Sequence, residues 1–97
     1  MPKPAKQFKE PQAYEEGPAP DIALNDVESH KIRQIGYCPE TRTLAVTFQR
    51  SPSIYHYPDV AAETAQAFMA AESKGRYFGE HLADLPFRKY RGEPLPA

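Results

Sequence analysis

The residues best suited to chemistry in this chain are cations interleaved with aromatic side chains near the C-terminal end. They are Lys74, Arg76, Arg88, Lys89 and Arg91, together with Tyr77, Phe87 and Tyr90. Basic side chains contact phosphates, and exposed aromatic rings stack on bases, which contributes about 1–3 kcal/mol per base. The pattern indicates a nucleic-acid-binding surface, for which the candidate residues are Lys74, Arg76, Tyr77, Arg88, Lys89 and Tyr90. The alternative is that the rings belong to the core and the cations only solubilise the surface.

The sequence gives little indication of a catalytic or metal-binding site. The histidines are far apart and lack the spacing of metal ligands, so we expect structural or surface roles, with His56 the most exposed of them. Ser29, Ser73 and Cys38 lack a neighbouring base that would activate a nucleophile. We therefore predict no enzyme activity, no catalytic residue, no metal and no cofactor.

Charge and composition permit a binding protein without demanding one. The whole chain has 12 Lys and Arg against 13 Asp and Glu, but residues 27–91 carry nine against seven and are mildly basic. Cys38 is the single cysteine, which excludes an internal disulfide and is typical of a reducing compartment. No apolar run is long enough to span a membrane. We expect a cytoplasmic protein of bacterial or phage type with no membrane partner.

The chain divides into an arm, a domain and a tail. Five of the 11 prolines fall within residues 1–20, a stretch with few core-forming side chains. Such a segment buries too little apolar surface to offset its ordering entropy. We predict that residues 1–26 are disordered or become ordered on a partner, with Tyr14 and residues 22–24 as the candidate contacts. The folded domain is expected at 27–91 and a flexible tail at 92–97.

Three stretches are typical of strands with short connections. Residues 43–49 are the clearest, because Leu44, Val46 and Phe48 point one way and Thr43, Thr47 and Gln49 the other. In residues 29–37, Ile32 and Ile35 are three apart, so a bulge near 34–36 is needed to place both on the core side. With residues 54–57, these stretches predict a three-stranded antiparallel meander that is dry on one face and wetter on the other.

Two helices are expected after the strands. The alanine-rich run 60–73 predicts the main helix, with Asp59 as its N-cap and Gly75 as a left-handed residue after its end. Ser73 is expected to bond to carbonyls of its last turn. Residues 77–85 predict a short second helix anchored by Phe78. The fold class is therefore α+β, with both helices packed on one face of the sheet.

The run from Val27 to Tyr90 resembles the KTSC domain family, whose small modules occur alone in bacteria and phages and fused behind some lysyl-tRNA synthetases. The most specific matching piece is Ser-Lys-Gly-Arg-Tyr-Phe at 73–78; weaker pieces lie at 27–29, 32, 35–37, 39–48, 55–57, 59–60, 71–72 and 85–87. The chain departs from the family at His30, Cys38 and Ala61, where a serine, an aspartate and a proline are usual. The resemblance implies RNA as the preferred nucleic acid and no catalytic activity.

Two functions remain open from the sequence. The first is RNA binding through the basic and aromatic residues. The second is a protein-interaction module, such as a phage or bacterial accessory factor, that uses the wetter sheet face with Tyr55 and Tyr57 and the N-terminal arm. A homodimer through the sheet edge would also account for a small core.

Overall fold

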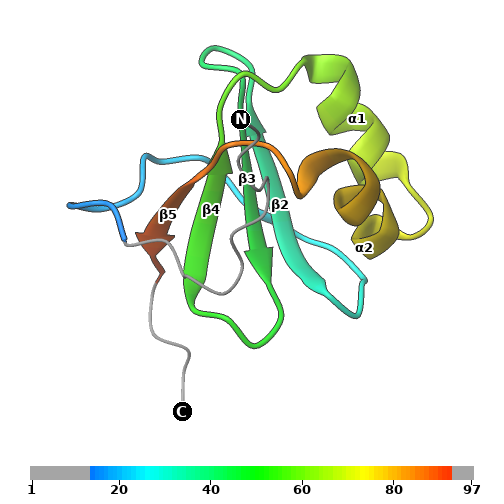
Figure 1. Ribbon diagram of the computed structural model, residues 1–97, viewed down its shortest axis with the longest axis horizontal. Coiled ribbons are helices and arrows are strands. Elements are labelled where there is room, and N and C mark those ends of the chain that lie inside the picture. Colours follow the sequence, from blue (N-terminus) through cyan, green and yellow to red (C-terminus); the bar gives the residue numbers. More distant parts are fainter. Residues whose placement is uncertain (1–13, 93–97) are drawn as a thin grey trace, which may run out of the picture.

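The computed structural model describes residues 14–92, and the parts of the predicted arm and tail at 1–13 and 93–97 lie outside the described residues. Within the described residues, five antiparallel strands form one sheet in the order β1-β2-β3-β4-β5, so neighbours in sequence are also neighbours in space (Figure 1). The strands are β1 (Asn25–Asp26), β2 (Ile32–Cys38), β3 (Thr43–Phe48), β4 (Ser53–Tyr57) and β5 (Arg88–Arg91). The α+β class and the antiparallel sheet are confirmed. The predicted meander corresponds to β2–β4, and β1 and β5 extend it on either side.

The first face of the sheet carries the apolar side chains of β3, as the alternation in its sequence predicts. Leu44 and Val46 are fully buried and lie opposite Tyr57 and Tyr55 of β4. A register shift in β2 between Ile32 and Gln34 places Ile32 and Ile35 on this face, and both are buried. The bulge is confirmed in kind, but it lies nearer the start of β2 than the predicted 34–36.

The helical layer covers this face and consists of α1 (Ala62–Ala70), α2 (Lys74–Tyr77) and a π-helical turn, η1 (Phe78–Leu82) (Figure 1). Phe68 of α1 is fully buried. Phe78 anchors the second helical segment as predicted, because its ring packs edge-on against Phe48 of β3 at a centroid distance of 5.2 Å. Among residues 14–92, no helix is long and apolar enough to cross a membrane.

The main helix is shorter than the predicted 60–73 at both ends. Its N-cap is Ala61, and Asp59 has a positive φ of 60°, so the prediction of Asp59 as N-cap is wrong. Both backbone groups of Val60 bond to the β2–β3 hairpin: its N–H donates to the carbonyl of Arg42 in the turn at 2.9 Å, and its carbonyl accepts from the Tyr37 hydroxyl of β2. These contacts hold residue 60 in the core and delay the start of the helix.

The prediction of Gly75 as a left-handed residue is also wrong. The extended conformation of Ala71 ends α1, and Gly75 lies inside α2 with a helical backbone. Ser73 accepts a hydrogen bond from the Arg76 N–H at 3.3 Å and therefore begins α2 instead of closing α1. The two helices meet at the predicted junction, but the cap belongs to the second of them.

The second face of the sheet is covered by the chain that precedes β1. Figure 1 shows this segment, blue to cyan, crossing from the side of β5 towards β2. A Cβ atom on Gly36 would meet the Ala23 carbonyl, which places the segment directly on β2. Ala45, Thr47 and His56, which face this side, are 0%, 1% and 4% exposed. The predictions of a wetter face and of an exposed His56 are therefore wrong.

Candidate nucleic-acid interface

The first group of candidate residues lies on α2, and its position follows from the cap. Ser73 fixes the first turn of α2, so that Lys74 projects back towards the end of α1. The Lys74 ammonium donates to the Ala71 carbonyl at 3.0 Å, which satisfies a free carbonyl at the C-terminal end of α1. Lys74 is half-buried, and one of its three protons is used in this contact.

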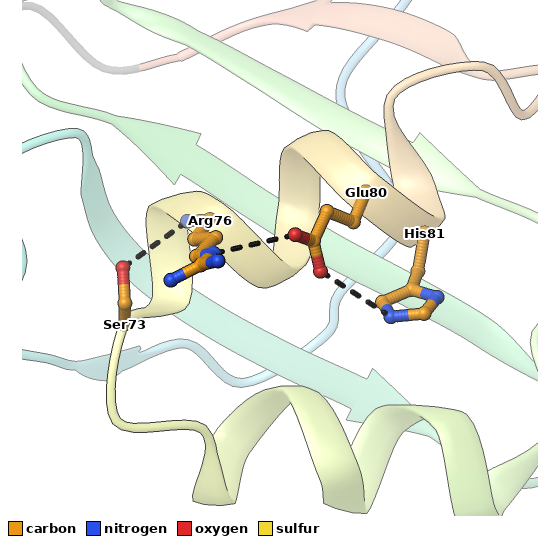
Figure 2. A network of polar contacts seen from close by, with 4 residues as sticks. All are labelled: Ser73, Arg76, Glu80 and His81. Atoms are coloured by element: carbon orange, nitrogen blue, oxygen red, sulfur yellow. Dashed lines mark hydrogen bonds and ion pairs between the residues drawn. The ribbon is translucent and has the colours of Figure 1, made fainter.

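Arg76 is the most accessible of the α2 candidates. Figure 2 shows its guanidinium pointing along the helix to Glu80, with Nε 3.3 Å from Oε2, and His81 on the other side of the same carboxylate at 3.9 Å. The Arg76 side chain is 78% exposed. An exposed i,i+4 pair contributes only about 0.3–0.5 kcal/mol, so a phosphate could replace Glu80 as the partner of Arg76.

Tyr77 is packed into the helical layer. Its ring stacks on Phe68 with a centroid distance of 5.6 Å and an interplanar angle of 19°, and it also contacts the His81 ring. The face that lies on Phe68 is not available to a base. For this residue the structure favours the core role that the sequence left as an alternative.

The second group lies on β5, where side chains alternate between the two faces of the sheet. Arg88 lies opposite His56, and Lys89 lies opposite Tyr55, so these cations point to opposite faces. Tyr90 is 7% exposed, and its ring packs on His56 at 4.9 Å. Arg88 is exposed and Lys89 half-buried, whereas Tyr90 is part of the packing of the second face.

The two groups do not form one surface. Gly75 of α2 lies against Lys31, with a Cβ on Gly75 3.5 Å from the Lys31 Cβ, so α2 sits beside the start of β2. The other group is on β5, and β3 and β4 lie between the two strands. At about 4.8 Å per strand, β2 and β5 are roughly 14 Å apart. The candidate residues therefore divide into an α2 group and a β5 group.

An aromatic ring outside the candidate list completes the β5 group. Tyr14 lies under two cations, with its ring centroid 4.8 Å from Lys89 Nζ and 4.5 Å from Arg91 Cζ. Its hydroxyl is 2.7 Å from Ser53 Oγ, and the neighbouring Glu15 N–H donates to the Lys89 carbonyl at 2.7 Å. We call Tyr14, Ser53, Lys89 and Arg91 the Tyr14 cluster. Tyr14 was noted in the sequence as a contact of the arm, but nothing local relates it to Ser53, 39 residues away.

An open groove of about 220 Å³ lies between the chain before β2 and the α1–α2 junction. Glu28 and Glu72 contribute carboxylates to its lining, and Lys31 and Lys74 contribute ammonium groups. The Ser29 hydroxyl accepts from the backbone N–H groups of Lys31 and Ile32. The groove has opposite charges in equal number and hydroxyls occupied by the backbone, so it does not favour a ligand of one charge.

The structure also bears on metal binding and on the tyrosines that the sequence predicts to face solvent. Within residues 14–92, no group of three or more His, Cys, Asp or Glu side chains could hold a metal ion. Tyr57 is 2% exposed and Tyr55 is half-buried on the helical face. The prediction that these tyrosines present an exposed binding surface is wrong, because the helical layer and Phe87 cover them.

Comparison with known proteins agrees with this architecture. The KTSC domain model matches residues 28–87. An uncharacterized protein of Stutzerimonas stutzeri is 35% identical over 65 residues, which cover 67% of this chain and 90% of that protein. The crystal structure of a KTSC domain protein from Yersinia pestis has 32% sequence identity and a TM-score of 0.63, and the match covers 75% of this chain and 100% of that one. With the Ser-Lys-Gly-Arg-Tyr-Phe junction and the β2–β4 meander inside the matched residues, the chain belongs to the KTSC domain family.

Proposed function

We propose that this protein is a non-catalytic binding module that holds single-stranded nucleic acid, RNA preferred, along β5. The observation that carries the proposal is the Tyr14 cluster with its neighbour Arg88. Three cations, Arg88, Lys89 and Arg91, follow one another along an edge strand, and an aromatic ring lies beside two of them. In single-strand recognition, cations contact the backbone while the bases make π contacts with aromatic rings or with cationic side chains. The Tyr14 ring occupies a position in which Lys89 and Arg91 already make such contacts with a flat ring.

The α2 group is a weaker candidate for the same role. The Lys74 ammonium is held by the Ala71 carbonyl, and Arg76 is paired with Glu80. Tyr77 is stacked on Phe68 and offers little ring surface. We therefore assign the main contact to β5 and leave Arg76, with the exposed Lys31 beside α2, as the competing surface to be tested.

The overall charge makes the expected binding local and salt-dependent. The chain carries a formal net charge of −1, so long-range attraction to a polyanion is weak. Binding must then come from a few close contacts between cations and phosphates. For a single strand, each such contact contributes about 0.7 to the slope of log K against log salt.

The test is binding of a labelled oligouridine of roughly 12 nucleotides by fluorescence anisotropy between about 50 and 200 mM salt. The Arg88→Gln/Arg91→Gln variant removes two cations from β5, and Lys31→Gln/Arg76→Gln removes the same charge beside α2. We expect the β5 variant to lower the salt slope by about 1.4 and the α2 variant to change it little.

Two results would contradict the proposal. If the unmodified protein shows no salt-dependent binding, nucleic-acid binding is wrong. If the α2 variant loses more affinity than the β5 variant, the assignment to β5 is wrong. The unfolding midpoint of both variants in urea serves as the control for loss of structure.

The same edge strand supports a second candidate, the pairing of β5 with another copy of the chain. An edge strand has backbone groups that can pair with another strand. The Lys89 carbonyl already accepts from Glu15, which occupies part of this edge and places a dimer second. Sedimentation of the unmodified protein and of the β5 variant distinguishes the two candidates, because a dimer forms without RNA.

A further inference from the structure

We propose that the space held by Tyr14 is a nucleobase-binding subsite, formed by Ser53, Lys89 and Arg91, in which Tyr14 acts as an intramolecular competitor. The inference rests on the proposed function and deepens it. It identifies a nucleobase as the part of the RNA that enters the subsite and the Tyr14 ring as the group that must leave it. It also predicts that the unmodified protein binds RNA more weakly than its β5 residues would allow.

The geometry of the subsite comes from the register of β4 and β5. Ser53 lies opposite Arg91, and Tyr55 lies opposite Lys89, so Ser53, Lys89 and Arg91 share one face of the sheet. The two cations are two residues apart on the same strand and both approach the Tyr14 ring, at 4.8 and 4.5 Å from its centroid. The Ser53 hydroxyl meets the polar end of the ring at 2.7 Å. The subsite therefore accepts a flat π-system with a polar edge.

A nucleobase has the same properties as the ring that now fills the subsite. Its π-face attracts a guanidinium or an ammonium, and its edge carries hydrogen-bonding groups that a serine hydroxyl can meet as donor or acceptor. Its attached phosphate would find Arg91 exposed on the same face of the strand. An aliphatic ligand would meet only part of this arrangement, because it offers neither a π-face to the cations nor a polar edge to Ser53.

Tyr14 is held by contacts that a ligand can replace. They are one hydroxyl contact with Ser53, one backbone hydrogen bond from Glu15 and the two cation–π contacts. The ring is only half-buried. A cation–π contact at an exposed site is weak, so a base can displace the ring without unfolding the core.

Most of the subsite lies outside the part of the chain that matches the KTSC model. The match covers residues 28–87, so Tyr14 precedes it and β5 begins immediately after it. The matched region therefore supplies Ser53, whereas Lys89, Arg91 and Tyr14 come from the segments that flank it.

The experiment compares the full chain with its Tyr14→Ala and Tyr14→Phe variants. The probes are the labelled oligouridine and an abasic ribose-phosphate oligomer of the same length. We expect Tyr14→Ala to bind oligouridine about tenfold more tightly, whereas its affinity for the abasic oligomer stays unchanged. Tyr14→Phe keeps the ring, and we expect its affinity to lie close to that of the unmodified protein.

The outcomes separate this inference from the proposed function. If the unmodified protein binds oligouridine and Tyr14→Ala binds equally or more weakly, Tyr14 is no competitor and the inference is overturned while RNA binding stands. If no variant binds either oligomer, both fail. Should Tyr14→Ala be poorly folded, titration of the unmodified protein with uridine monophosphate gives a second test: the amide signals of Ser53 and Lys89 should shift, and unchanged signals would overturn the subsite.

Discussion

His56 is a titratable ring placed where water does not reach it. It packs against the Tyr90 ring, with 4% of its surface exposed. Burial lowers the pKa of His56 below its ordinary value of 6.5, because the charged form loses its hydration. The folded protein therefore binds a proton at this site less readily than the unfolded chain does.

This difference predicts that the protein loses stability in acid. Above pH 6.5 the ring is neutral in both states and its contribution is complete. As the pH falls below that value, the unfolded chain takes up the proton first, and the free energy of unfolding falls by at most about 1.4 kcal/mol per pH unit. The His56→Phe variant keeps a ring beside Tyr90 and should flatten this dependence in urea unfolding between pH 7.5 and 5. The exposed His81→Gln variant is the control, and an equal flattening in both variants would contradict the assignment to His56.

Individual aromatic residues show why the candidate site was only partly predictable. Tyr77 and Tyr90 have the side chains that a base-stacking surface requires, yet one stacks on Phe68 and the other packs on His56. Residue type and spacing are the same for both roles. Only the packing partner distinguishes them, and that partner lies far away in the sequence.

The elements differ in how clearly the sequence specifies them. Strand β3 was predicted because Leu44, Val46 and Phe48 alternate without interruption and are covered by the helical layer. Strand β5 was missed because Arg88–Arg91 has no apolar alternation, and its backbone partners in β4 are 32 or more residues away. An edge strand rich in cations is typical of natural sheets, since charge opposes unwanted pairing.

The junction between α1 and α2 shows the same limit for helices. Ser73 and Gly75 both carry a terminus signal, and propensity alone favours glycine as the end of the first helix. The structure instead ends α1 at Ala70, so that Ser73 can cap α2 and Phe78 can reach Phe48. Tertiary contacts decided between two local signals of similar strength.

The contact of the N-terminal segment with β2 predicts that a larger residue at position 36 destabilises the protein. In the Gly36→Ala variant the added methyl group would meet the Ala23 carbonyl and the Ile22 side chain, so the segment must move off the sheet. Overpacking of this kind costs about 1–3 kcal/mol, and we expect a loss of that size in urea unfolding. Hydrogen exchange should also become faster for the amides of residues 22–24.

The matched control is the same substitution at Gly79. A Cβ there meets nothing within 4 Å, and the residue lies inside the helical turn η1. Alanine should be neutral or stabilise the turn by about 0.5–1 kcal/mol, because it loses less backbone entropy than glycine. A Gly36→Ala variant as stable as Gly79→Ala would show that the segment does not pack closely on β2.

At the scale of the whole molecule, the sheet has two covered faces with different origins. The helical face lies within residues 28–87 of the KTSC match and was largely predicted from periodicity. The second face is covered by residues that precede the match, whose proline-rich composition gave no pattern that could be assigned to a partner. The sequence therefore predicted the part of the fold inside the KTSC match better than the part outside it.

This division predicts the effect of removing residues 1–24. The helical-face core, with Leu44, Val46 and Phe68 fully buried, lies within the remaining chain, so we expect a folded protein with a cooperative but lower unfolding transition. The loss should be larger than that of Gly36→Ala, because Ala45, Thr47 and His56 become exposed together. A newly exposed sheet face also favours association, so sedimentation should show a dimer that increases with concentration.

An unchanged unfolding midpoint in a monomeric product would contradict the covering role of the segment. A product without a cooperative transition would show that the domain requires residues 1–24 to fold.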